Sequence, residues 1–262
     1  MKRIACTCIL AICAVWAQAS DTWLKPLKFV YQPGETAGIS YQVGDNLIGK
    51  PQSFNKNNIE KLELYEQSGV TDLRPAINTG EAESLSLVMR QEGTSLIAFE
   101  TRPAFEIYPT VEKFNEYVRN EGFEQFISKR SAGETVTEQT IRYMKLALQI
   151  GAKRDDTGTK SIGHTLELVP DINPYTLKKK GEKIRFTVLY KGKPLFGTRV
   201  KVQNREDSRT TIQNIYTEKD GTIEMIVSNT GIWMISAIVI EASGTQGIEC
   251  NGYHASYVFG IE

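Results

Sequence analysis

The sequence predicts a mainly β protein in which two β-sandwich domains flank a short α-helical segment. Three observations support this prediction. Strand-length runs of alternating apolar and polar residues, separated by turn residues, recur about every ten residues over 20–108. The apolar spacing becomes helical over 109–160. Alternating strand patterns then return over 161–262.

The first β region, residues 20–108, shows the alternation clearly around its second predicted strand. Ile39, Tyr41 and Val43 alternate with polar or small residues, and Pro33-Gly34 and Gly44-Asp45 mark turns on either side. Further short apolar runs lie at 62–65, 85–88 and 95–99. Several short strands joined by turns are typical of a sandwich.

The middle region, residues 109–160, predicts two helical pieces and a linker. Thr110 is a candidate N-cap for the first piece, and Gly122 breaks it. Thr137 is a candidate N-cap for a second helix that ends at Gly151. The apolar stripe of this second helix consists of Ile141, Met144 and Leu148.

The second β region, residues 161–262, repeats the strand pattern. Asp220-Gly221 predicts a hairpin turn, because glycine accepts the positive φ that such turns need. Residues 232–240 are apolar on both faces of the predicted strand, with Ser236 as the one polar residue, and this is typical of a strand covered on both faces. The alternation in the last strand places His254 on its wetter face, after a turn at Asn251-Gly252.

Two distant stretches resemble one another. Gly34-Glu35 and Gly181-Glu182 each precede an alternating strand, and aligning the two pairs brings the apolar positions of both strands into register. We interpret the two regions as similar β modules.

The first 19 residues have the features of a secretory signal peptide. Lys2 and Arg3 precede an apolar run, and Ala17-Gln18-Ala19 has the A-x-A form of a cleavage site. We expect cleavage near Ala19 and a periplasmic or secreted protein. Lipoprotein processing at Cys13 is the alternative, which the bulky Ile12 before it disfavours. No later stretch is apolar over the roughly 20 residues that a transmembrane helix needs.

The charge balance argues against nucleic-acid-binding proteins, and the cysteine content argues against disulfide-stabilised ones. The chain has 31 basic and 31 acidic residues, a balance that gives no support for binding to nucleic acid. Three of the four cysteines lie in the predicted signal peptide, so an intramolecular disulfide is excluded after cleavage and Cys250 remains as a single thiol.

Catalytic motifs do not emerge from the sequence. There is no G-x-S-x-G nucleophile elbow and no H-E-x-x-H zinc helix. Paired carboxylates such as Asp155-Asp156 lie in predicted loops, where solvated charge is their ordinary role. The sequence therefore predicts a protein that is not an enzyme.

Six segments of the chain carry a family resemblance: TWLKPLKFVYQPGET, LIAFETRPAFEIYPTVEKFNEYVRNEGF, IRYMKLALQIG, LELVPDINPY, GKPLFGTRVKV and GIWMISA. Taken in this order, they resemble the NikM-like family of secreted bacterial proteins, a domain of unknown function. The resemblance implies a C-terminal domain that is Ig-like or carboxypeptidase-regulatory-like. It also implies a periplasmic component of nickel or cobalt uptake, with a membrane transport component or another envelope protein as partner.

The chain departs from the family at one point. Many members place a histidine just after the cleavage site, whereas this chain has Ser20-Asp21-Thr22 there. A free amino terminus with a nearby imidazole forms a strong nickel site, and that imidazole is missing. If a nickel or cobalt ion binds, the candidate ligands are Ser20, Asp21, His164, Cys250 and His254.

Two functional hypotheses follow. The first is a secreted, non-enzymatic binding or accessory protein linked to transition-metal uptake. The alternative is a cell-envelope module without a metal site, which binds protein or glycan through loops or exposed aromatic residues. Aromatic residues within strand alternation, such as Trp23, Trp233 and Phe259, are expected in the core.

Overall fold

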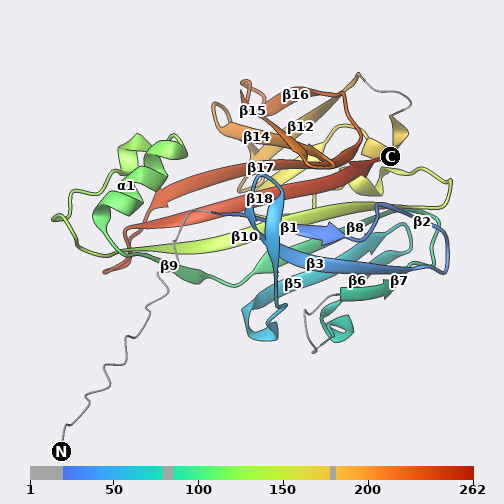
Figure 1. Ribbon diagram of the computed structural model, residues 1–262, viewed down its shortest axis with the longest axis horizontal. Helices are drawn as coiled ribbons and strands as arrows, with labels where there is room; N and C mark the ends of the chain where they lie inside the picture. The colour runs from blue at the N-terminus through green and yellow to red at the C-terminus, as the bar shows by residue number, and fades with distance from the viewer. Residues whose placement is uncertain (1–19, 79–84, 178–180) are drawn as a thin grey trace, which may run out of the picture.

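The computed structural model describes residues 20–78, 85–177 and 181–262, and strands dominate it (Figure 1). The predicted signal peptide, with Cys13, and the basic run at 178–180 lie outside the described residues. The described residues contain one α-helix, α1 (Val111–Asn120). Short 3-10 helices lie at Lys56–Asn58, Arg74–Ala76, Glu124–Phe126, Asp156–Thr159 and Pro174–Thr176.

The strands form three sheets. Sheet A contains β1 (Asp21–Pro26), β3 (Thr36–Asp45), β4 (Ile48–Gln52) and β7 (Leu85–Val88). Sheet B is ten-stranded and follows the order β15 (Arg209–Tyr216), β14 (Arg199–Glu206), β17 (Gly231–Ala242), β18 (Cys250–Ile261), β10 (Val136–Ile150), β8 (Gly93–Thr101), β5 (Ile59–Glu66) and β6 (Gly69–Asp72), while β2 (Val30–Tyr31) and β9 (Ala104–Tyr108) also pair with β10. Sheet C contains β11 (Leu166–Pro170), β12 (Glu182–Tyr190), β13 (Lys193–Pro194) and β16 (Thr222–Val227).

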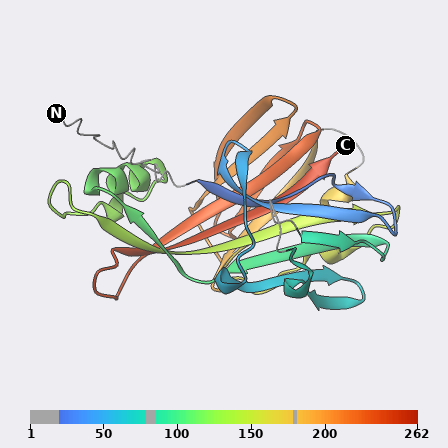
Figure 2. The ribbon, with the colours of Figure 1, turned by 60° about the horizontal axis from the view of Figure 1, so that its bottom comes forward.

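Sheets A and C cover opposite faces of sheet B (Figures 1 and 2). Met144 and Leu146 of β10 lie in the core under sheet A, whereas Tyr143 and Ala147 of the same strand lie in the core under sheet C. Because side chains alternate along a strand, these two cores lie on the two faces of sheet B. The predicted fold class, a mainly β protein built of sandwiches, is confirmed.

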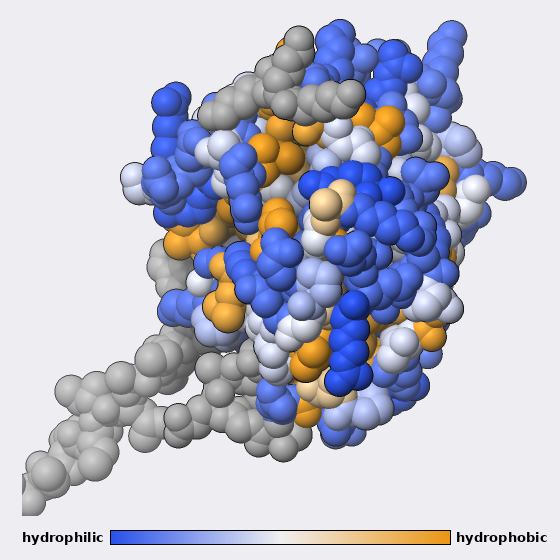
Figure 3. Space-filling model, turned by 90° about the vertical axis from the view of Figure 1, so that its right-hand side faces the viewer, coloured by the Kyte–Doolittle hydropathy of each residue, from blue (hydrophilic) through white to orange (hydrophobic). Residues whose placement is uncertain are grey.

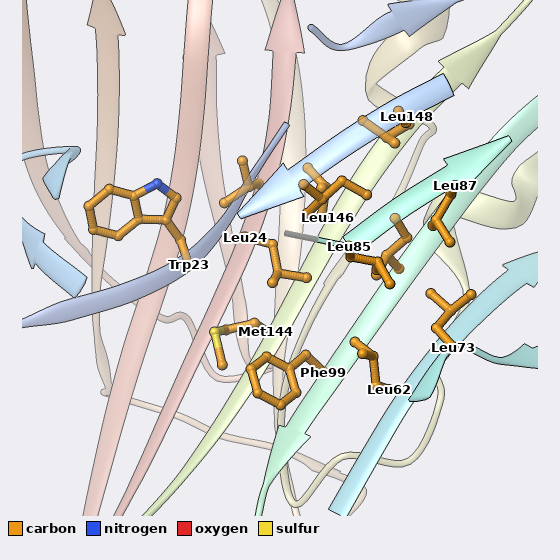
Figure 4. Packing of buried hydrophobic residues seen from close by; sticks show 14 of the residues in the cluster. Trp23, Leu24, Leu62, Leu73, Leu85, Leu87, Phe99, Met144, Leu146 and Leu148 are labelled. Atoms are coloured by element: carbon orange, nitrogen blue, oxygen red, sulfur yellow. The ribbon is translucent and has the colours of Figure 1, made fainter. Parts of the chain in front are cut away.

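The core under sheet A joins strands that are far apart in the sequence. Figure 4 shows side chains of β5, β8 and β10 meeting those of β1 and β7. The labelled members of this core are Trp23, Leu24, Leu62, Leu73, Leu85, Leu87, Phe99, Met144, Leu146 and Leu148. Trp233, Tyr257 and Phe259 belong to the core under sheet C, so the expectation that the strand aromatics are buried is confirmed for them and for Trp23.

The two halves of the molecule repeat one strand order. In sequence, β1, β3, β4, β5, β6, β7, β8 and β10 correspond to β11, β12, β13, β14, β15, β16, β17 and β18, with the same pairing partners. Gly34 and Gly181 occupy equivalent places: both have positive φ, and each N–H donates over 2.7 Å to a carbonyl at the end of the partner strand, that of Met89 just after β7 and that of Val227 in β16. The two modules meet where β10 and β18 pair in parallel.

One helix predicted from the sequence is confirmed and the other is wrong. Thr110 caps α1, and its hydroxyl accepts from the N–H of Lys113. The region expected as a second helix from Thr137 to Gly151 is instead the strand β10. Its last eight residues, 143–150, are buried on both faces, so the apolar residues show no alternation and mimic a helical stripe.

One end of the molecule is largely hydrophilic (Figure 3). Figure 3 shows separate apolar patches among hydrophilic residues on the end of the molecule that lies at the right in Figure 1. Among the described residues, no helix is long and apolar enough to cross a membrane.

Candidate functional site

The candidate site lies on the face of β10 that sheet A covers, at the point where its residues change from apolar to polar. Met144 and the even-numbered residues after it pack into the core under sheet A. Glu138, Thr140 and Arg142 precede them on the same face, because side chains two apart share a face. Beyond Glu138, α1 packs over the end of the sheet and buries Tyr108 and Tyr117. The polar residues of β10 therefore lie between the part of the strand that sheet A covers and the end that α1 covers.

A pocket of about 220 Å³ opens beside these residues. Sheet A, the segment after β4, and strands β8, β9 and β10 all contribute to its wall. The lining residues are Tyr41, Val43, Ser53, Asn55, Asn58, Phe99, Thr101, Arg102, Ala104, Glu106, Thr140 and Arg142. This volume is below the usual range for drug-sized ligands, about 300–1,000 Å³, so the pocket suits a small ligand.

Arg142 is the dominant charged group of the pocket. Its Nη2 donates to Glu106 Oε1 over 2.8 Å, and its side chain is 14% exposed. Its backbone N–H donates to Thr101 Oγ1 over 3.0 Å, which holds the strand position. A guanidinium has five N–H donors, and within the described part of the chain Glu106 occupies one of them. No other protein acceptor of this guanidinium is found among the described residues.

Further donors and an apolar wall surround Arg142. Asn55 Oδ1 accepts from the N–H of Asn57, so the donor end of its amide is the part left for a ligand. Tyr41 packs edge-on against Phe99 with ring centroids 5.4 Å apart. Burial raises the pKa of the Tyr41 hydroxyl, which therefore stays protonated and able to donate. Arg102 is anchored on Glu60 and on a backbone carbonyl.

A buried carboxyl lies next to the pocket. Glu138 is fully buried, and it accepts from Tyr108 Oη over 2.8 Å and from Tyr117 Oη over 3.3 Å. Burial, with a smaller contribution from nearby Glu106, outweighs the tyrosine hydrogen bonds and Arg142 and raises the pKa of this carboxyl to about 7. Glu138 thus titrates near neutral pH.

His254 completes the polar face. It lies directly opposite Arg142 in the parallel β10–β18 pair. Its Nε2 is buried without a hydrogen-bond partner in the described part of the structure. Burial, and then the positive charges of Arg142 and Lys201, hold the pKa of this imidazole well below its usual range. The histidine is therefore neutral at ordinary pH.

Gly252 separates His254 from Glu138. A Cβ placed on Gly252 would overlap the Glu138 carboxylate and would lie 3.2 Å from His254 Nε2. Glycine is thus required for the two groups to approach this closely. The predicted turn at Asn251-Gly252 is wrong, because both residues lie inside β18, where they pair with β10 and β17.

The structure disperses the residues predicted as metal ligands. Asp21 accepts from Lys201 Nζ over 3.2 Å and from Gln203 Nε2 over 2.8 Å. Cys250 is fully buried in the cluster under α1, and burial raises the pKa of its thiol. His254 lies four residues further along the same strand, a separation of about 13 Å. The His254 residue is half-buried and its imidazole Nε2 is buried, so the histidine is less exposed than a fully wet position would make it.

His164 lies on the other face of sheet B. It packs against Tyr143 with ring centroids 5.1 Å apart, beside the buried pair Lys145–Glu167. Burial and the nearby lysine lower its pKa to about 3. Ser20 begins the described chain next to Asp21. Among the described residues, no three His, Cys, Asp or Glu side chains are grouped so that they could hold a metal ion. The five candidates therefore do not fit one nickel or cobalt site, and their role as ligands stays a prediction.

Sequence reasoning missed Glu138, Arg142 and Glu106. The available signal was the continuous polar run 137–140, followed by Arg142, directly before the apolar end of β10. The sequence alone did not show which of these polar residues share a face, because the segment was assigned to a helix.

A family model covers most of the chain. It matches residues 17–241 and is described as a domain of unknown function, DUF4198. The chain belongs to the DUF4198 family. This membership confirms the predicted resemblance at the level of an uncharacterised domain. No curated protein sequence matches this DUF4198 chain.

Solved structures provide distant matches. The D0-D1 domain of intimin is 13% identical, with coverage of 92% of this chain and 98% of that one and a TM-score of 0.21. A tetra-tandem repeat in the extending region of a large adhesion protein is 12% identical, with coverage of 93% and 50% and a TM-score of 0.25. The D00-D0 domain of intimin is 10% identical, with coverage of 91% and 99% and a TM-score of 0.20. At these TM-scores the matches carry no argument about function.

Proposed function

We propose that this DUF4198 protein is a non-enzymatic binding module of the cell envelope, exported by its N-terminal segment, which takes a small polar ligand in the pocket on β10. The observation that carries the proposal is Arg142: a largely buried guanidinium that lines a concave site and, within 20–78, 85–177 and 181–262, uses one of its five N–H donors on protein. A charged donor held in place by a sheet is a preformed element of recognition.

Two lining hydroxyls support binding over catalysis. Thr140 Oγ1 donates to the carbonyl of Ala104, and Thr101 Oγ1 accepts from the N–H of Arg142. Both hydroxyls therefore hold the pocket wall together, and neither is placed as a nucleophile on a general base.

A ligand screen with the mature protein, residues 20–262, tests this proposal. Amide and arginine side-chain resonances would be followed by NMR during titration with small sugars, carboxylic acids and amino acids. We expect saturable shifts around Arg142 that are lost in Arg142→Gln and kept in Arg209→Gln, a matched change on the exposed edge strand β15. A screen in which no compound shifts the pocket resonances would contradict the proposal.

A role in nickel or cobalt uptake is the second candidate, and one observation favours it. His254 offers a neutral imidazole whose Nε2 is buried without a protein partner in the described region. Calorimetric titration of the protein beginning at Ser20 with nickel and cobalt tests it. This candidate predicts binding that is lost in His254→Gln and kept in His164→Gln. The absence of a saturable site tighter than about 100 µM, roughly −5.5 kcal/mol, would remove it.

A further inference from the structure

We infer that the ligand of the pocket is a sugar-sized molecule that bears a carboxylate, a hexuronate in chemical class, with the carboxylate bound to the Arg142 guanidinium. This inference rests on the proposed function, because it names the chemistry of the ligand that the pocket takes. Three features of the pocket carry it: its donors, its apolar wall and its size.

Hydrogen-bond donors outnumber acceptors around the pocket. Counting acceptors in the described part of the chain, Arg142 retains four N–H donors beyond the one that Glu106 accepts, and Asn55 presents the donor end of its amide. The Tyr41 hydroxyl adds a donor whose pKa is raised by burial. The Glu106 carboxylate is the charged acceptor in the lining, and it is itself engaged with Arg142. A site of this kind is complementary to a ligand that is rich in acceptor oxygens.

The charge arrangement favours a carboxylate at one end of that ligand. The Arg142 side chain is 14% exposed, whereas its partner Glu106 is 39% exposed. The negative partner therefore lies closer to solvent, and the guanidinium faces a less hydrated region. A planar guanidinium binds a carboxylate through two parallel N–H donors, and such charge-assisted bonds are stronger than neutral ones. Arg142 has enough unused donors for a second carboxylate beside Glu106.

The rest of the lining suits a sugar ring. Tyr41, Val43 and Phe99 supply apolar lining, with Tyr41 and Phe99 in contact, and these side chains can contact the C–H groups of a ring. Asn55, Asn58 and Ser53 place amide and hydroxyl groups at the rim, where ring hydroxyls can donate and accept. The volume of about 220 Å³ is appropriate for one ring rather than for an extended chain.

Calorimetry and NMR with four probes test the inference: D-glucuronate, D-galacturonate, D-glucose and acetate. We expect at least one hexuronate to bind saturably, and at least tenfold more tightly than glucose or acetate. Arg142→Lys, which keeps the charge and loses the planar fork, should weaken hexuronate binding at least tenfold. Arg209→Gln should leave it unchanged. Binding should also weaken as salt is raised, since a charge pair is screened.

Asn58→Asp provides a second variant that spares the buried face of β10, because Asn58 lies in an exposed 3-10 helix at the rim. The added negative charge should weaken hexuronate binding and leave glucose binding unchanged. Glucose that binds as tightly as the hexuronates would overturn the inference and leave the proposed function standing. If hexuronates fail to bind while another compound shifts the pocket resonances, the inference is likewise overturned and the proposed function stands. If no compound of any class binds there, both the inference and the proposed function are rejected.

Discussion

Glu138→Gln should change how the stability of the protein depends on pH. Burial raises the pKa of the Glu138 carboxyl from 4.5 to about 7. In the unfolded chain this carboxyl loses its proton near its ordinary pKa, whereas in the folded protein it keeps the proton to higher pH. Between these values the folded state binds more protons, so the free energy of unfolding falls as pH rises. The contribution of the protonated Glu138 carboxyl to the free energy of unfolding is fully present below about pH 4.5 and is lost as pH rises through about 7.

The size of the effect follows from the shift. A difference of about 2.5 pKa units corresponds to about 3 kcal/mol, since each unit is worth about 1.4 kcal/mol. Glutamine resembles the protonated carboxyl and can still bond Tyr108 and Tyr117, but it does not ionise. The wild-type protein should therefore lose about 3 kcal/mol relative to Glu138→Gln between about pH 4 and about pH 9.

Urea unfolding followed by tryptophan fluorescence measures this difference, because Trp23 and Trp233 are both buried. Other titrating groups are common to both proteins and cancel in the comparison. Glu218→Gln, at an exposed position, is the matched control and should run parallel to wild type. Parallel curves for Glu138→Gln and wild type, or a wild type that gains stability relative to Glu138→Gln as pH rises, would refute the reasoning.

Three further predictions concern the interior. Gly252→Ala should lower the free energy of unfolding by about 1–3 kcal/mol, because the new methyl group overlaps the Glu138 carboxylate; an unchanged urea midpoint would contradict this. Lys145→Met removes the ion-pair partner of the fully buried Glu167, 2.5 Å away. It should lower the free energy of unfolding by about 3–5 kcal/mol in the same urea assay, and a decrease below about 1 kcal/mol would contradict this prediction. The fully buried Cys250 thiol, whose pKa is raised by burial, should react with a disulfide reagent only after unfolding, so rapid labelling of the native protein would count against this structure.

The strand entries and turns could be predicted from the sequence because local chemistry determines them. Gly34 and Gly181 both adopt positive φ, a conformation that glycine adopts without steric cost. Gly221 also has the expected positive φ, but its turn joins β15 of sheet B to β16 of sheet C, so the hairpin predicted there is wrong. Thr110 caps α1 through its own side chain. Each of these features depends on residues within a few positions of one another.

The assignment of β10 and the pocket could not be predicted, because both depend on distant contacts. Residues 143–150 are buried on both faces only because sheets A and C lie on either side of them. Glu106, Glu138 and His254 meet only after β9 and β18 pair with β10. Sequence periodicity carries no information about which strands become neighbours, and the pairing of β10 with β18 joins residues more than 100 positions apart.

The parallel seam between β10 and β18 has a consequence for the integrity of the chain. Two modules with one strand order, joined edge to edge, have the geometry of a symmetric dimer whose subunits have been fused. Separating the two modules would expose a long unpaired strand edge of sheet B on each of them, from Glu138 to Leu146 on one and from Cys250 to Val258 on the other. A proteolytic nick in the segment between β10 and β11 should thus leave the two fragments associated as one non-covalent particle, and each fragment alone should aggregate.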